Sequence, residues 1–151
     1  MFSFMIKEQI AFIANYLWRQ SINHLNSQLT ETEIKNFSTN DYYYLTTIYH
    51  LGKPNFSQLA DALKLTKPAI SMIIKKLSSM GLIEKIQFAE DKRIYHISLT
   101  AKGKQIIDGD EELYEKIDLL VKKIVNSDEK YKELEKLFDE LVWNLESNNL
   151  N

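Results

Sequence analysis

Helix caps and a helix breaker recur at short intervals in the middle of the chain, and this spacing restricts the fold more than any other feature. Asn55 and Gln58 are spaced as a capping box, which predicts a short helix starting at this point. Thr66 is placed to cap a second helix, and Pro68 falls in its first turn, where a missing N–H does little harm. Gly81 ends that second helix. The segment is therefore predicted to form two short helices joined by a tight turn.

Two runs with strand character come next. The first covers residues 82–87, and the second covers residues 94–99, where large apolar side chains recur at every second position. Residues 88–93 lie between them and form a polar tip with charges of both signs. Helix, tight turn, helix and hairpin, in this order, are the layout of a winged helix-turn-helix. The predicted fold class is therefore mainly α with a small β-wing (α+β).

Amphipathic patterns flank this segment on both sides. Apolar residues at helical spacing predict a long helix within residues 4–30 and further helices across residues 105–146. Gly103 and Gly109 are expected to soften the first turns of the later region, because glycine weakens a helix interior. A helix as apolar as the first one needs a partner surface to cover it.

The chain is expected to be a single domain, residues 1–151. Ser38 is a plausible cap for a short helix that ends at Gly52, and it opens the winged lobe, residues 38–104. The two flanking stretches, residues 4–30 and 105–146, then form a separate helical region.

The charge distribution separates the middle of the chain from its flanks. Residues 52–104 contain ten basic and four acidic residues, a net charge of +6, whereas the whole chain carries −2. A basic centre on an acidic scaffold is typical of a module that binds DNA. A chance cluster of solvated lysines would give the same count, so charge alone does not decide between the two interpretations.

Several classes of function find no support in the composition. The chain has no cysteine, which excludes disulfides, cysteine-ligated zinc and thiol redox sensing. No motif places a nucleophile beside a base, and no glycine-rich loop is available to cradle a phosphate, so we expect neither an enzyme nor a cofactor. No stretch approaches the ~20 apolar residues of a membrane span, and the first residues lack the features of a secretory signal. A cytoplasmic protein without a membrane partner is expected.

The exposed side of the second helix is predicted to contact DNA. Small residues near its start let its N-terminus approach a major groove, while lysines and a serine can bind phosphates or base edges. At the hairpin tip, Lys92 and Arg93 are cationic, and an arginine there can enter a narrow minor groove. The residues assigned to DNA contact on the helix are Thr66, Lys67, Pro68, Ala69, Ser71, Met72, Lys75 and Lys76. For Lys75 and Lys76, an ordinary place on the solvated surface is an equal alternative.

One group of motifs is specific enough to suggest a family. Asp91-Lys92-Arg93 is followed after five residues by Leu99-Thr100, and then by Lys102-Gly103. Upstream, the stretches at 59–63 and 77–83 read Leu-Ala-Asp-Ala-Leu and Leu-Ser-Ser-Met-Gly-Leu-Ile. With these motifs, residues 38–107 resemble the MarR family of bacterial regulators. Outside these residues the likeness is one of layout only.

The resemblance implies a homodimer in which the terminal helices of two chains interlock and each chain binds half of a palindromic site. It implies that residues 66–76 lie in the major groove, and that Asp91 holds and orients Arg93 for the minor groove. Met72 stands where many relatives have a basic residue, and Lys75 stands where an acid is common. The resemblance therefore leaves the operator sequence open.

Aromatic and histidine side chains offer two further candidate sites. Tyr16, Trp18 and Tyr42 are either core residues or walls of a pocket, and the resemblance implies a small aromatic or lipophilic effector for such a pocket. The three histidines, His24, His50 and His96, are isolated from one another and from acid clusters, so no metal site is expected.

These observations predict a dimeric transcription regulator, and a repressor is favoured over an activator. Its expected partners are double-stranded DNA, a second copy of the chain and a small effector. The alternative from another class is a winged-helix module that contacts proteins and has no specific DNA site.

Overall fold

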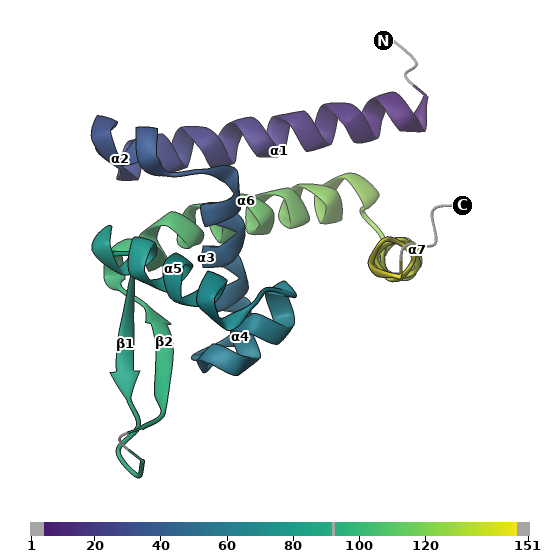
Figure 1. Cartoon of the computed structure of the whole chain (residues 1–151). Helices are drawn as coiled ribbons and strands as arrows, with labels where there is room; N and C mark the ends of the chain where they lie inside the picture. Colours follow the sequence, from purple (N-terminus) through teal and green to yellow (C-terminus); the bar gives the residue numbers. More distant parts are fainter. Residues whose placement is uncertain (1–4, 92, 148–151) are drawn as a thin grey trace. The chain divides into compact units, whose positions relative to one another are not determined.

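The computed structural model describes residues 5–91 and 93–147, which fall into two compact units divided between residues 110 and 111. The elements are α1 (Ile6–Gln28), α2 (Glu31–Asn36), α3 (Thr39–Leu51), α4 (Phe56–Leu63), α5 (Lys67–Ser79), β1 (Ile83–Gln87), β2 (Tyr95–Leu99), α6 (Ala101–Val125) and α7 (Asp128–Glu146) (Figure 1). Helices with a small two-stranded antiparallel sheet confirm the predicted mainly α fold with a β-wing.

The predicted caps are confirmed. Asn55 and Gln58 form the reciprocal capping box of α4, and Ser38 forms the same motif with Asp41 at the start of α3. The side chain of Thr66 accepts from the backbone of α5. These local hydrogen bonds satisfy N–H groups that a helix start leaves unpaired, so the sequence alone determines where the helices begin.

Glycines and left-handed residues set where the helices end. Gly81, which follows α5, has φ +70°, a conformation that favours glycine. After α4 the turn uses Lys64 at φ 52° instead, and the N–H of Leu65 closes it by donating to the Ala60 carbonyl at 3.1 Å. This tight turn sets α5 directly after α4, which is the helix-turn-helix arrangement.

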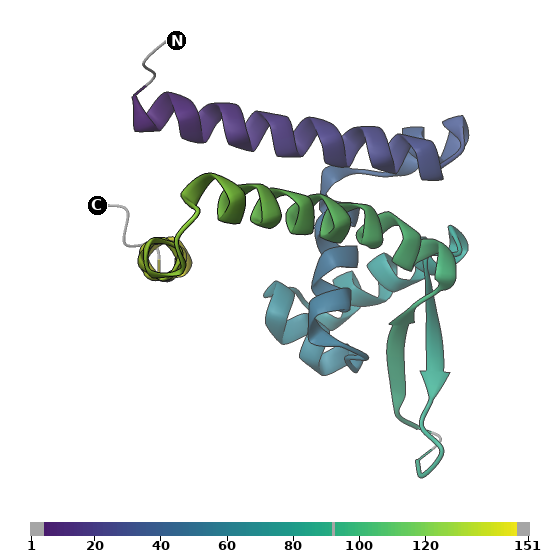
Figure 2. The same cartoon turned by 180° about the vertical axis from the view of Figure 1, so that it is seen from behind.

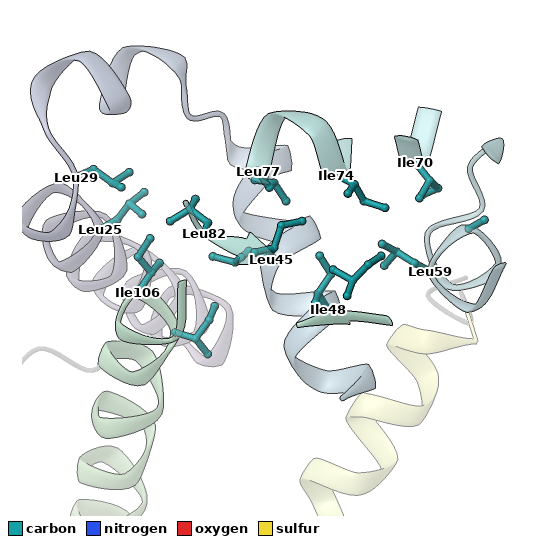
Figure 3. Packing of buried hydrophobic residues seen from close by; sticks show 14 residues of the cluster. Leu25, Leu29, Leu45, Ile48, Leu59, Ile70, Ile74, Leu77, Leu82 and Ile106 are labelled. Atoms are coloured by element: carbon teal, nitrogen blue, oxygen red, sulfur yellow. The ribbon is translucent and has the colours of Figure 1, made fainter. Parts of the chain in front are cut away.

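One core holds the elements of the first unit together. Leu45 and Ile48 of α3 lie against aliphatic side chains of α4 and α5 (Figure 3). Leu25 of α1 lies with Leu82 and Ile106 beside them, so the end of α1 and the start of α6 share this core. Burying each aliphatic side chain of this size contributes roughly 1.5–3 kcal/mol.

The hairpin is tied to the helices by a third extended segment. β1 pairs with β2 in antiparallel register, with Ile83 opposite Leu99. On its other side β2 meets the residues before α4: the N–H of Ile97 donates to the Pro54 carbonyl at 2.8 Å, and Asn55 forms a bridge with His96. The strands project from the lobe of α3, α4 and α5 (Figure 1, Figure 2). This pairing was not anticipated, although a residue before proline favours extended backbone.

Two glycines that the sequence suggested were soft points are sites of close packing. A Cβ on Gly103 would lie 2.1 Å from the carbonyl oxygen of Leu82, and a Cβ on Gly109 would lie 2.2 Å from the ring of His24. His24 also contacts the Gln105 carbonyl at 2.8 Å, beside a buried hydrogen bond from Ser21 to Asp110. The start of α6 is therefore helical from Ala101, and both glycines lie in close contact with neighbouring segments.

The second unit consists of the end of α6 and α7. Asn126 takes φ 47° in the turn, and the side chain of Ser127 caps α7 by accepting from the Lys130 N–H. Asp118 accepts from Lys122 at 2.5 Å and from the hydroxyl of Tyr131, which joins the two helices. None of the residues of α7 is buried. Over the residues described, no helix is both long enough and apolar enough to cross a membrane.

Candidate nucleic-acid interface

Helix α5 has two chemically distinct faces. Ile70, Ile74 and Leu77 recur at helical spacing and are fully buried against the core. The opposite face is polar and small at its start, where Thr66 caps the helix and Pro68 needs no hydrogen-bond acceptor. This amphipathic pattern fixes which residues α5 presents to solvent.

Most residues predicted to contact DNA lie on the solvent face of α5. Thr66, Lys67, Pro68, Ser71 and Lys75 are exposed, and Met72 is 74% exposed, while Ala69 is half-buried. A large apolar side chain held this far into solvent at the centre of the face has no packing role within the described residues of this chain. Its thioether and methylene groups suit an apolar contact such as a thymine methyl.

Lys76 differs from its neighbour Lys75. Its Nζ lies 2.5 Å from Oδ2 of Asp41 on α3, and its side chain is 41% exposed. Asp41 is only 4% exposed and also accepts from the N–H and the hydroxyl of Ser38. Burial raises the pKa of Asp41, but hydrogen bonds from Lys76 and Ser38 outweigh it, so this pKa lies below the ordinary value of an aspartate. Sequence reasoning treated Lys76 only as a surface or phosphate-binding residue and did not anticipate this pair.

At the wing tip, Asp91 shapes the backbone. Its Oδ1 accepts from the N–H of Arg93 at 2.9 Å, and its carbonyl accepts from the N–H of Ile94 at 3.0 Å. Arg93 itself is exposed. Asp91 therefore orients Arg93 through the main chain, which refines the expectation that Asp91 holds and orients it. Lys92, also predicted to contact DNA, lies outside the described residues.

A shallow groove places the start of α4 beside Arg93. It is lined by Asn55, Phe56, Ser57, Arg93, Ile94 and Tyr95. Lys85 of β1 lies 5.5 Å from the centre of the Phe56 ring, so a second cation lies near the same helix start. Helix N-termini attract phosphates through their free N–H groups. Asn55 and Ser57 were missed as candidate contacts, because their nearness to the wing follows from the pairing of residues 53–55 with β2.

The aromatic residues proposed as pocket walls separate into two groups. Trp18 and Tyr42 line one pocket of about 170 Å³ between α1, α2 and the start of α3, whereas Tyr16 is not among its lining residues and is exposed. The other lining residues are Ser21, Ile22, Leu25, Asn26, Ile34, Phe37, Ser38 and Thr39. The hydroxyl of Tyr42 is buried, and no described residue lies within hydrogen-bonding distance of it. A buried hydroxyl without a partner is unfavourable, and a ligand in this pocket that reached the hydroxyl would satisfy it.

Among the described residues, no group of three histidine or carboxylate side chains is placed to bind a metal ion. His96 contacts the Lys53 carbonyl at 2.8 Å through Nδ1, and its ring lies 4.9 Å from that of Phe88. Its visible role is to fasten the wing to the segment before α4.

The arrangement matches a known family. The MarR family model aligns with residues 37–95, which span α3, α4, α5, β1 and the wing tip. Residues 37–95 are therefore similar to the MarR family. The MarR-family segment includes every residue predicted to contact DNA, and it confirms the resemblance inferred from the wing motif.

Two curated relatives share this part of the chain. One is the HTH-type transcriptional regulator BilQ of Clostridioides difficile, 30% identical over 95 residues, which are 63% of this chain and 64% of BilQ. The other is the uncharacterized HTH-type transcriptional regulator YhjH of Bacillus subtilis, 28% identical over 64% of this chain and 51% of YhjH. The chain therefore spans between half and two thirds of the length of these relatives.

Solved structures extend the likeness in fold to nearly the whole chain. Staphylococcus aureus MepR bound to ethidium bromide superposes with a TM-score of 0.67 at 17% identity, covering 94% of this chain and 97% of MepR. A MepR mutant bound to an oligodeoxyribonucleotide gives a TM-score of 0.56 at 17% identity, covering 95% of this chain and 99% of that protein. A MarR-like regulator of Thermotoga maritima gives 0.62 at 23% identity, over 95% of this chain and 99% of that one. These structures show that the winged helix fold is shared.

Proposed function

We propose that this protein is a sequence-specific transcription regulator that binds double-stranded DNA as a homodimer. In this proposal α5 of each protomer enters a major groove, and the wing places Arg93 at the adjacent minor groove. The two protomers bind a palindromic operator, with one half-site each. Bound to a promoter, the dimer represses transcription by occupying the DNA.

The exposed face of α5 carries the proposal. A recognition helix must present small residues and hydrogen-bond donors at its start and cations farther along, and α5 has Pro68, Ser71 and Lys75 in these places. Arg93 on the wing adds a separate cation next to the groove at the start of α4. The names of the curated relatives, both HTH-type transcriptional regulators, support the same function.

Uncovered apolar surface supports the homodimer. In the first unit, the start of α1 exposes Ile6, Ile10, Phe12 and Ile13. In the second unit, α7 exposes a stripe of large apolar side chains at helical spacing, namely Leu137, Phe138, Leu141, Val142 and Leu145. Surfaces of this kind are rarely left open in a soluble protein, and a second copy of the chain would cover them.

The decisive experiment is selection of bound DNA from a random double-stranded pool, followed by measurement of affinity for the selected site at increasing salt. We expect enrichment of a palindrome whose half-sites lie about one helical turn apart. If the dimer makes about six phosphate contacts, its affinity should fall roughly a thousandfold between 50 and 200 mM salt.

Failure to enrich any sequence would contradict the proposal and favour the alternative, a winged-helix module that contacts proteins. Enrichment of a site without a salt dependence would also contradict it, because the lysines and Arg93 would then make no phosphate contacts. A promoter carrying the selected site, placed before a reporter gene, tests repression: expression should fall when the protein is supplied.

We propose in addition that a small aromatic ligand binds the pocket at Trp18 and Tyr42 and lowers the affinity for DNA. The pocket volume of about 170 Å³ fits one or two fused aromatic rings, and its walls include the aromatic side chains of Trp18 and Tyr42. MepR, which shares the fold, has been solved with the aromatic compound ethidium, and this supports a ligand of that class.

A further inference from the structure

The C-terminal half of the recognition helix is held by two lysine contacts to other helices. Lys76 of α5 reaches Asp41 at the first turn of α3, with 2.5 Å between Nζ and Oδ2. From the other side, Lys102 of α6 donates to the carbonyl of Met80 at 3.3 Å and pairs with Glu33 of α2. The position of this end of α5 therefore depends on side chains outside the recognition helix.

Asp41 is the more buried of the two carboxylates. Its Oδ2 accepts from the Ser38 N–H at 2.7 Å, from the Ser38 hydroxyl at 2.8 Å and from Lys76. A capping box needs only the first kind of contact, so Asp41 links the start of α3 to α5 with the same oxygen that caps the helix. Charged hydrogen bonds to a buried carboxylate are strong and directional, which makes this link stiff.

The same residues form one wall of the pocket. Ser38, Thr39 and Tyr42 line the pocket, and Asp41 stands between the last two in sequence. A single hydrogen bond thus separates a pocket wall from the carboxylate that holds Lys76. Anything that displaces Ser38 changes the geometry of Asp41, and Lys76 must follow or lose its partner.

We propose that Asp41 is a positioning residue for the recognition helix, and that the chain Ser38–Asp41–Lys76 transmits the state of the pocket wall to the C-terminal half of α5. The inference rests on the proposed function, because it assigns the regulation of that same DNA-binding helix. It makes Lys76 a structural link and leaves Lys75, on the exposed face, as the lysine available to DNA.

The test measures amide hydrogen exchange in the protein without DNA, so its outcome is independent of whether an operator exists. Lys76→Met removes the charge but keeps the aliphatic stem, and Lys76→Arg keeps the charge. Lys75→Met removes the same charge from the next residue, which is exposed. We expect Lys76→Met to accelerate exchange at residues 74–80 about tenfold relative to α1. Lys76→Arg and Lys75→Met should exchange like the unmodified protein.

The link to the pocket is tested with Ile22→Phe, which enlarges a pocket wall on α1 away from the ion pair. When Lys76 is present, Ile22→Phe should change amide exchange at residues 74–80. In the Lys76→Met variant, adding Ile22→Phe should not change this exchange further. Asp41→Asn, which keeps an acceptor for Ser38 but loses the charge, should behave like Lys76→Met and serves as the second variant.

Three results would overturn the inference. In the first, Lys76→Met accelerates exchange equally in α1 and α5, which would make the pair a general stabilising contact. In the second, Lys76→Met matches Lys75→Met. In the third, Ile22→Phe leaves amide exchange at residues 74–80 unchanged, or changes this exchange to the same extent with and without Lys76. A failure to select DNA, by contrast, would contradict the proposed function and leave these exchange results standing.

Discussion

At the scale of single residues, the wing tip shows how one side chain prepares another for contact. Asp91 binds the backbone N–H of Arg93, so the guanidinium is free of it and exposed. The turn is ordered by a backbone hydrogen bond, so the guanidinium of Arg93 stays available to bind DNA. A cation presented in this way is suited to the negative potential of a narrow minor groove.

Arg93→Ala should therefore weaken binding to the selected operator by about 1–3 kcal/mol, because one cation leaves the groove. Fluorescence anisotropy with labelled operator DNA measures the change. Lys123→Ala, which removes the same charge from α6 in the second unit, is the control and should have little effect. Equal affinities for the Arg93→Ala variant and the unmodified protein would rule out the wing contact.

The Tyr42 hydroxyl, which has no partner among the described residues, predicts that a ligand able to accept a hydrogen bond binds more tightly. Quinoline and naphthalene have the same shape, but only quinoline can accept a hydrogen bond, so quinoline should bind several-fold more tightly. Tyr42→Phe should remove this difference while naphthalene binding stays the same. Because the chain has two tryptophans, Trp18 fluorescence in a Trp143→Phe background reports binding in the pocket. A preference for quinoline that survives Tyr42→Phe would contradict the role of the hydroxyl.

At the scale of elements, close approaches decide how helices and hairpin meet. The carbonyl of Leu82 accepts from the Thr100 N–H at 3.0 Å and lies 2.1 Å from the position that a Cβ of Gly103 would take. The hydroxyl of Thr100 in turn donates to the Gly81 carbonyl at 2.6 Å. Thr100 and Gly103 of the wing motif thus fasten the start of α6 to the residues that follow α5.

Gly103→Ala tests this packing against helix propensity. Propensity alone predicts stabilisation, since alanine favours a helix interior by about 1 kcal/mol over glycine. The clash with backbone predicts the opposite sign, a loss of roughly 1–3 kcal/mol in the free energy of unfolding. Urea unfolding followed by circular dichroism measures the sign. Glu115→Ala, at an exposed site of the same helix, is the control, and a stabilised Gly103→Ala variant would show that Leu82 moves aside easily.

The ion pair between α3 and α5 predicts an acid dependence. The pKa of Asp41 is lowered in the folded state, so its contribution to stability is present above the pKa of the unfolded chain, about 3.9. It is lost as pH falls below that value and the carboxylate becomes protonated. Asp41→Asn should therefore unfold at a lower denaturant concentration at pH 7, and its midpoint should fall less steeply between pH 5 and 3. Parallel pH profiles for the two proteins would contradict this assignment.

At the scale of the whole molecule, the apolar stripe of α7 is the main unsatisfied feature. None of the residues of α7 is buried, so packing within its own chain leaves Phe138 and Leu141 exposed. Burial of such side chains in a second copy would contribute on the order of 1.5–3 kcal/mol each. Stability and assembly should therefore depend on each other.

Introducing Phe138→Glu and Leu141→Glu together should convert a dimer into a monomer, because two charges would enter the apolar stripe. Light scattering after size exclusion gives the mass directly. Asn144→Glu adds a negative charge at another exposed position of the same helix and should leave the mass at twice that of one chain. A monomeric unmodified protein would contradict the homodimer, and a doubly substituted dimer would place its interface elsewhere.

Local signals in the sequence were sufficient for the order of the elements. Asn55, Thr66 and Gly81 act on backbone groups within a few residues of themselves, so their effect does not depend on the rest of the fold. The same holds for the wing motif, whose spacing led to the family. The short helix α2 went unnoticed, although Thr30 and Glu33 form a capping box that could have revealed it.

Only the tertiary structure decided which neighbours these residues meet. Lys75 and Lys76 are the same residue type in neighbouring positions, yet only Lys76 pairs with Asp41. Asp41 lies 35 residues earlier in the chain, so this pair forms only when α3 packs on α5. Trp18 and Tyr42 share a pocket that Tyr16 does not, for the same reason. The sequence by itself determined the elements and the recognition face, since both follow from local hydrogen bonding and periodicity. The pocket and the link from it to α5 depend on contacts between distant segments, which local chemistry does not specify.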